Sequence, residues 1–236
     1  MALPGKGHSP QSLEVIAVFA DLPPDTLAKI RTRCAWRRYQ PGEPIIQHSD
    51  SSNDVYFISE GEARANIHSV DGTVVTFCDL GRGEMFGEIA AIDGGPRSTT
   101  IEARTNCLIA SMSAATFREL LWSEPALAAT LLQYFARKTR DLTTRIYEFS
   151  ALAVNNRIQA EVLRLANLAS RQGRTAYIDP APTHAEIASR TSTHREAVTR
   201  ELNRLSRLGI IEQVGRTINV KDIKRLGALV REVTGE

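Results

Sequence analysis

Residues 83–100 read Gly83-Glu84-Met85-Phe86-Gly87-Glu88-Ile89-Ala90-Ala91-Ile92-Asp93-Gly94-Gly95-Pro96-Arg97-Ser98-Thr99-Thr100. This stretch organises the chain: a glycine-bounded turn, a short helix and a second turn lead into a strand. Gly87 lets backbone N–H groups approach a ligand, and the start of segment 88–92 supplies unpaired donors. Arg97 offers a fork of donors for a phosphate, with the Ser98 hydroxyl beside it. Glu88 would repel a phosphate, so we expect it to accept a hydrogen bond from a sugar hydroxyl. The alternative interpretation is a surface turn with a solvated Glu and Arg.

The order of these residues resembles the phosphate-binding cassette of cyclic-nucleotide-binding domains. The matching residues are Phe86-Gly87-Glu88-Ile89-Ala90 and Pro96-Arg97-Ser98. The resemblance implies that Arg97 and Ser98 hold the cyclic phosphate and that Glu88 holds the ribose 2′-OH. It places the other predicted ligand-binding residues in the cassette (Gly87, Ile89 and Ala90) and on a strand that faces the base (Phe77 and Cys78).

The charge of the chain is divided unevenly along its 236 residues. Residues 1–155 carry 15 Lys or Arg and 18 Asp or Glu, whereas residues 156–236 carry 14 and 9. A basic second part indicates a polyanionic partner. No apolar run is long enough to span a bilayer and residues 1–10 lack the apolar core of a signal peptide, so we expect a cytoplasmic protein without a membrane partner. We interpret the scattered cysteines Cys34, Cys78 and Cys107 as buried free thiols, with a redox sensor as the alternative, and predict no metal site.

The hydrophobic pattern predicts an α+β protein. Residues 1–10 are rich in Gly and Pro and are expected to be mobile, and residues 11–33 show the spacing of short helices. Between residues 34 and 112, short strands alternate with turns every 8–12 residues, including a hairpin about Asp71-Gly72. The resemblance implies a jelly-roll β-barrel. We divide the chain into a barrel domain with N-terminal helices at 1–123, a long helix and hinge at 124–154, and a third domain at 155–236.

A long helix is predicted from about residue 126 to about residue 153, after a shorter helix capped by Ser113. Phe135, Leu142 and Phe149 repeat every seven residues. A helix of this length with such a seam favours a parallel homodimer, and the alternative is a helix packed wholly on its own barrel. Residues 153–156 are the expected hinge.

The third domain contains two short helices with capping signals. Thr183 is followed by Glu186, and Thr193 by Glu196, so each pair predicts a capping box. A longer helix is expected before them, starting at Asn156 and ending at Gln172-Gly173. Strand-forming residues at 210–220 predict a two-stranded wing, and a last helix is expected at 222–233. Together these elements predict a winged helix-turn-helix that binds double-stranded DNA.

The outer face of the second short helix carries residues suited to DNA. Arg195 and Arg200 suit guanine and Glu196 suits cytosine, in the first two turns that enter a major groove. Thr199 lies on the same face. Thr183, His194 and Arg216 are better interpreted as phosphate contacts that set position. The alternative is a solvated charged face.

The whole pattern is similar to the Crp/Fnr transcription regulators, and within them to the cyclic-AMP receptor (catabolite activator) proteins. The pattern Arg195-Glu196-x-x-x-Arg200 implies a palindrome of TGTGA-type half-sites. An ungapped alignment puts Leu142-Thr143 where the best-known members carry Thr-Ser, which implies that Thr143 reaches the ligand from the partner subunit. Leu142 removes the hydroxyl associated with adenine, and Ser98 can also reach the 2-amino group of a syn guanine. Cyclic AMP is therefore the first choice of allosteric effector and cyclic GMP the second.

The resemblance gives one further expectation, and two rival interpretations stand beside it. RNA polymerase is an expected partner, with no specific contact surface in the sequence. One rival is a Crp/Fnr regulator that answers another signal or binds DNA constitutively. The other rival is an enzyme regulated by or acting on cyclic nucleotides, for which we find no nucleophile–base pair and no catalytic loop.

Overall fold

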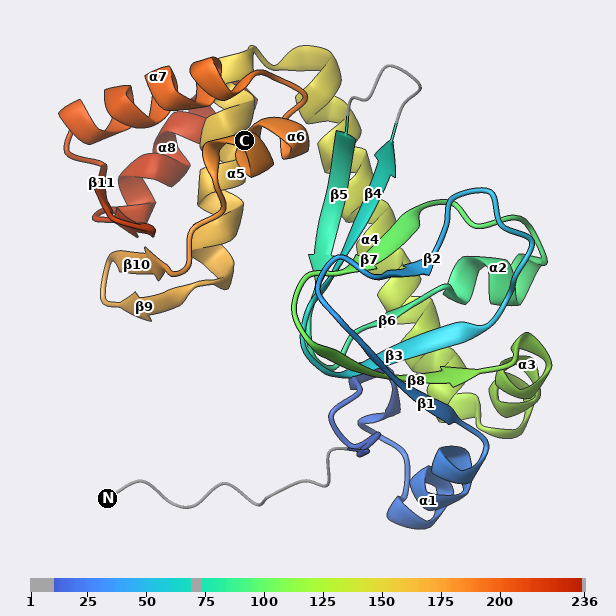
Figure 1. Ribbon diagram of the computed structural model, residues 1–236. Coiled ribbons are helices and arrows are strands. Elements are labelled where there is room, and N and C mark those ends of the chain that lie inside the picture. The colour runs from blue at the N-terminus through green and yellow to red at the C-terminus, as the bar shows by residue number, and fades with distance from the viewer. Residues whose placement is uncertain (1–10, 69–73, 235–236) are drawn as a thin grey trace. The chain divides into compact units, whose positions relative to one another are not determined.

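The computed structural model describes residues 11–68 and 74–234, which fall into two compact units, Met1–Lys138 and Thr139–Glu236 (Figure 1). The segment expected to be mobile at 1–10 and the predicted turn at Asp71-Gly72 lie outside the described residues. The elements of the first unit are η1 (Ala17–Phe19), α1 (Pro24–Thr32), β1 (Ala35–Tyr39), β2 (Pro44–Ile46), β3 (Val55–Glu60), β4 (Ala63–His68), β5 (Val74–Leu80), β6 (Met85–Phe86), α2 (Glu88–Asp93), β7 (Thr100–Ala103), β8 (Cys107–Met112) and α3 (Ala114–Ser123).

The strands of the first unit form two antiparallel four-stranded sheets, ordered β1-β8-β3-β6 and β2-β7-β4-β5. Among the described residues the sheets are not hydrogen-bonded into a closed barrel, but the antiparallel two-sheet arrangement agrees with the predicted fold. Successive residues of β3 point to opposite sides. Ile58 packs between the sheets with Ile101 and Ile109, whereas Phe57 packs outward against Phe19 and Phe117. β3 is thus buried on both faces. It pairs with β6, and Gly87 of the cassette comes directly after β6.

The N-terminal segment is less helical than its spacing predicted. Residues 11–16 form turns, and the only helical structure before α1 in the described residues is the single 3₁₀ turn η1. Leu13 and Ile16 are nevertheless buried in the core, so the apolar residues serve packing without a helix. α1 begins after Pro23 with Pro24 in its first turn, as Pro permits.

Two helices follow the sheets. Ser113 caps α3 by accepting a hydrogen bond from the Thr116 backbone N–H at 3.2 Å, which confirms the predicted cap. α4 (Pro125–Ala151) is the predicted long helix, with Pro at its first position. α4 crosses from the first compact unit into the second. None of the helices in the described part of the chain is long and apolar enough to cross a membrane.

The second unit continues with α5 (Val154–Leu168), β9 (Ser170–Gln172), β10 (Thr175–Ile178), α6 (His184–Arg190), α7 (Arg195–Arg207), β11 (Ile211–Val214), β12 (Thr217–Val220) and α8 (Ile223–Thr234). Its sheet is ordered β11-β12-β10-β9. The predicted start of α5 at Asn156 and end at Gln172-Gly173 were wrong. The helix begins two residues earlier, and residues 170–172 form a strand because they pair with β10.

A buried ionic cluster joins three helices of this unit. The Glu161 carboxylate on α5 is 1% exposed and lies 3.1 Å from Arg145 Nη1 on α4 and 3.4 Å from Arg190 Nη1 on α6. Arg164 also pairs with Glu161, and its Nη2 lies 2.6 Å from Glu148 Oε1 on α4. The last turns of α4 are therefore fastened to α5 and α6 by charge as well as by packing.

Candidate functional site

Gly87 is the residue on which the geometry of the cassette depends. It precedes α2 in the left-handed conformation, at φ +79°, which glycine adopts readily. A Cβ at this position would lie 2.6 Å from Arg97 Nη1 and 2.8 Å from the Asp54 carbonyl oxygen. A larger residue would therefore displace Arg97 as well as strain the backbone.

Arg97 is held in a fixed orientation below the start of α2. Its side chain is only 2% exposed, and it donates from Nε to Ser52 Oγ (3.1 Å), from Nη1 to the Gly87 carbonyl oxygen (3.0 Å) and from Nη2 to the Asp54 carbonyl oxygen (2.8 Å). Burial lowers the pKa of Arg97. These bonds use three of the five N–H groups of a guanidinium. The guanidinium is thus positioned before any ligand arrives.

Glu88 is a buried carboxylate at the first position of α2. It is 8% exposed, and this burial raises its pKa, while the positive charges of Lys138 and Arg97 oppose the shift. Of the other predicted cassette residues, Ala90 is buried, whereas Ile89 and Ser98 are exposed. The structure therefore brings Gly87, Glu88 and Arg97 together and leaves the Ser98 side chain accessible to solvent.

Phe77 and Cys78 lie on β5, as expected. A bulge interrupts the pairing of β5 with β4, so that Ala65 opposes Cys78 and Asn66 opposes Thr76. Phe77 is the extra residue and is 42% exposed, whereas Cys78 is half-buried beside the core between the sheets. The bulge thus turns the Phe77 ring toward solvent.

Sequence reasoning missed two residues of α4 near this site. Tyr134 is half-buried, and its pKa is raised by burial and by the nearby charges of Glu88, Glu84 and Cys78. Lys138 lies one turn later with its Nζ 5.4 Å from the Tyr134 ring centroid. Their four-residue spacing could have predicted that they share one face of the helix, but the seven-residue repeat indicated Phe135 instead.

Thr143 is exposed on α4 in the second compact unit. Its hydroxyl donates to the Thr139 carbonyl oxygen at 2.9 Å, a bond that leaves the oxygen lone pairs available as acceptors. Leu142 beside it is 57% exposed.

The helix-turn-helix is built on one capping box. The Thr183 hydroxyl accepts from the Glu186 backbone N–H, and the Glu186 carboxylate accepts from the Thr183 N–H. The second predicted box was wrong: α7 is preceded by His194, with no side-chain cap, and the Thr193 N–H donates to the Ala188 carbonyl oxygen at 3.1 Å. The turn between the helices keeps a left-handed residue, Ser192 at φ +46°, despite the missing glycine.

α7 separates an apolar inner face from a charged outer face. Val198, Leu202 and Leu205 are fully buried, as predicted. The predicted DNA-facing residues His194, Arg195, Glu196 and Arg200 are all exposed, and Arg216 is exposed in the turn between β11 and β12. Thr199 is half-buried, and its hydroxyl donates to the Arg195 carbonyl oxygen at 3.0 Å. The arrangement can present Arg195, Glu196 and Arg200 to a groove together.

The thiols of the chain all lie among the described residues. Cys34 and Cys78 are half-buried and Cys107 is buried, and burial raises the pKa of Cys34 to about 11. Within residues 11–68 and 74–234, no group of three or more His, Cys, Asp or Glu side chains is placed to hold a metal ion.

Comparison with known proteins matches two parts of the chain to known families of domains. Residues 36–124 match the cyclic nucleotide-binding domain, and residues 157–229 match the Crp-like helix-turn-helix domain. The chain is 23% identical to the CRP-like cAMP-activated global transcriptional regulator of Mycobacterium tuberculosis, over 91% of this chain and 96% of the relative. It is 27% identical to the cyclic AMP receptor protein of Thermus thermophilus, over 84% and 87% respectively.

A solved structure of similar fold is that of the c-di-GMP-responsive global regulator CLP of Xanthomonas campestris. It has a TM-score of 0.71 and 19% identity, over 84% of this chain and 99% of that chain. A cyclic-nucleotide-binding domain followed by a Crp-like helix-turn-helix defines a nucleotide-binding, DNA-binding transcription regulator. The chain belongs to the Crp/Fnr family of these regulators.

Proposed function

We propose that the protein is a homodimeric regulator in which cyclic AMP, with cyclic GMP as second choice, drives binding to a TGTGA-type palindrome. The observation that carries the proposal is the pre-positioned guanidinium of Arg97 under Gly87, with the buried Glu88 carboxylate at the adjoining start of α2. A positioned fork beside the backbone N–H groups at the start of a helix suits a phosphate.

Within this proposal each cassette residue has a distinct role. Arg97 gives its two remaining N–H groups to the cyclic phosphate, and the exposed Ser98 hydroxyl adds a third donor. Glu88 accepts from the ribose 2′-OH. Phe77 and Cys78 line the base side, and Thr143 of a second chain completes the site. Ile89 and Ala90 belong to the cassette backbone.

Exposed apolar side chains on α4 support the dimer. Leu132, Leu142, Ile146 and Phe149 are between 39% and 70% exposed. With Phe135 and Thr139 they follow the alternating spacing of three and four residues that is typical of a coiled-coil seam. A second copy of α4 would remove these side chains from water.

In the DNA complex, Arg195 and Arg200 contact guanine and Glu196 contacts cytosine. Thr183, His194 and Arg216 hold phosphates, and Thr199 lies on the same face. A dimer would place two such helices about 34 Å apart, in successive major grooves. The ligand acts by binding the DNA-competent form more tightly.

The names of the relatives support cyclic AMP, since one is called cAMP-activated and another a cyclic AMP receptor protein. The fold alone does not choose the effector, because the CLP structure of the same fold is described as responsive to c-di-GMP. An experiment must therefore distinguish the proposed cyclic-nucleotide effector from a different effector or from constitutive DNA binding.

Isothermal titration with cyclic AMP and with cyclic GMP tests the proposal directly. Arg97→Ala should weaken binding by about 10- to 100-fold, as expected for charge-assisted hydrogen bonds, and Arg97→Lys should also bind weakly because it lacks the fork. The control is Arg38→Ala, which removes an exposed arginine of β1 in the same unit. Unchanged affinity in Arg97→Ala would refute the cassette assignment. If the wild type binds neither nucleotide but binds DNA, the effector is a different one.

A further inference from the structure

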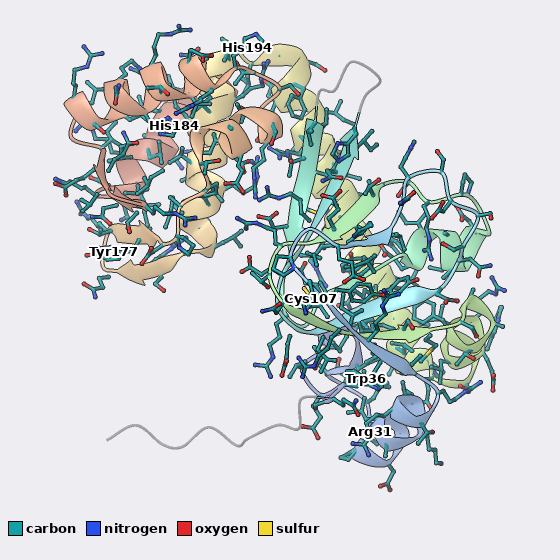
Figure 2. The ribbon with its side chains drawn as sticks, viewed as in Figure 1. Arg31, Trp36, Cys107, Tyr177, His184 and His194 are labelled. Atoms are coloured by element: carbon teal, nitrogen blue, oxygen red, sulfur yellow. The ribbon has the colours of Figure 1, made fainter. Side chains whose placement is uncertain are left out.

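His184 connects three elements of the DNA-binding domain. It is the first residue of α6 and is half-buried (Figure 2). Its Nδ1 lies 2.8 Å from Thr199 Oγ1 on α7, and its Nε2 lies 3.3 Å from Gln213 Oε1 on β11. One imidazole therefore joins the recognition helix to the wing.

The bond to Thr199 extends to the first turn of α7. The Thr199 hydroxyl has a single proton, which it donates to the Arg195 carbonyl oxygen at 3.0 Å. Thr199 must then accept from the Nδ1–H of His184. In the neutral imidazole Nε2 is then an acceptor, so Gln213 bonds to it through its amide N–H, with the side-chain amide turned by 180° from the orientation that places Oε1 there. With that orientation a continuous path of hydrogen bonds runs from Gln213 through His184 and Thr199 to the backbone of Arg195.

We propose that His184 is a positioning residue for DNA binding. It holds the first turn of α7 at a fixed distance from strand β11. Base-edge hydrogen bonds in a groove need their donors within a few tenths of an ångström, whereas phosphate contacts by long exposed side chains tolerate more movement. Loss of the hydrogen bonds of His184 should therefore reduce affinity for a specific sequence more than affinity for DNA in general.

A direct contact between His184 and a phosphate is the competing explanation. The two explanations differ in whether the losses of DNA-binding free energy caused by separate substitutions add up. If His184 acts through Gln213, removal of both side chains costs less than the sum of the two single losses. If His184 touches DNA itself, the two losses add. Thr199→Val, which keeps the shape but not the hydroxyl, should interrupt the same path from the other side.

The test uses the full-length protein and an operator selected from random DNA by the wild type, so it does not depend on the TGTGA assignment. Affinity is measured by fluorescence anisotropy on that operator and on a mixed-sequence duplex, with and without cyclic AMP. His184→Ala, Gln213→Ala and Thr199→Val should each weaken operator binding by about 3- to 10-fold, the range expected for one lost hydrogen bond, and change mixed-sequence binding little. The His184→Ala/Gln213→Ala double variant should fall short of the product of the two single losses.

Two further variants separate positioning from general damage. His184→Asn can place an amide N–H near the former Nδ1 and should recover part of the operator affinity through Thr199. If His184→Ala unfolds the domain, Gln213→Ala and Thr199→Val still carry the test, because both retain the imidazole. Equal losses on operator and mixed-sequence DNA, additive losses in the double variant, or unchanged operator affinity would each overturn the proposal. Absence of a cyclic AMP effect would refute the proposed effector and leave this test intact.

Discussion

Glu161 offers the sharpest test of how the second unit is held together, through the substitution Glu161→Gln. Its carboxylate is 1% exposed and forms ion pairs with Arg145, Arg164 and Arg190. Arg145 and Arg164 keep Glu148 as a second carboxylate, at 3.6 and 2.6 Å, whereas Arg190, 8% exposed, loses its ion pair with Glu161. Removing one partner of a buried ion pair costs about 3–5 kcal/mol. The glutamine amide keeps an acceptor, so we expect the lower end, about 3 kcal/mol.

This loss is large beside the roughly 5–15 kcal/mol that stabilises a typical domain. The matched control is Glu212→Gln on β11, which removes the same charge from the exposed Glu212–Lys221 pair, half of whose side-chain surface is in water. Exposed pairs contribute at most about 1 kcal/mol, so the control should unfold much like the wild type.

Tryptophan fluorescence would not report this change, because both tryptophans, Trp36 and Trp122, lie in the first unit. Hydrogen exchange followed by mass spectrometry resolves the second unit separately. A loss of about 3 kcal/mol should speed exchange of the most protected α5 and α7 amides by roughly 100-fold. Peptides from β3 and β8 should be unchanged and serve as the internal reference. If Glu161→Gln exchanges no faster than Glu212→Gln, the buried cluster does not stabilise this unit and the reasoning is wrong.

Three other substitutions test the proposed sites. Burial raises the folded-state pKa of Glu88, so the stability contributed by its proton is present below the unfolded pKa and is lost as pH rises through the folded value. Glu88→Gln should therefore be more stable than the wild type in urea at neutral pH, by a margin that shrinks in acid, while it binds nucleotide less tightly; a margin independent of pH would contradict this. Arg195→Ala should cost roughly 1–3 kcal/mol on the operator and relax preference at one base pair, whereas an equal loss on mixed-sequence DNA would identify a phosphate contact. Thr143→Ala should weaken nucleotide binding and nucleotide-driven DNA binding together, unlike Thr144→Ala, whose hydroxyl makes the same kind of bond to its own helix; a loss of DNA binding alone would make Thr143 a conformational element.

The features that could be predicted from the sequence depend on neighbours in the chain. The caps at Ser113 and Thr183 and the wing of β11 and β12 each need partners within a few residues. Gly87 could be predicted as well, because close approach to a ligand and a left-handed turn both demand glycine. The second predicted capping box did not form because the Thr193 backbone N–H donates to the Ala188 carbonyl oxygen of α6, and the cap position before α7 falls one residue later, at His194.

The buried charges of α5 could not be predicted in this way. Helical periodicity assigns polar residues to the solvent side, yet Gln159 and Glu161 are 2% and 1% exposed. Their partners stand far away in the chain: Gln159 Nε2 donates to Glu201 Oε1 at 2.7 Å, and Glu161 meets Arg145 and Arg190. Only the fold brings these groups together, and their pairing offsets the free-energy cost of burying them.

The bonds around α5 also bear on how DNA binding is controlled, because they surround the expected hinge at 153–156. Arg157 donates to the carbonyl oxygens of Leu152 (3.2 Å), Thr191 (3.0 Å) and Ser192 (3.2 Å), so one side chain ties the end of α4 to the turn before α7. The Glu161 cluster fastens the same turns of α4 to α5 and α6. Within the second unit, α7 is therefore oriented by the last turns of α4. Glu161→Gln removes part of this fastening, so it should also weaken the coupling between nucleotide and DNA, even where nucleotide affinity is unchanged.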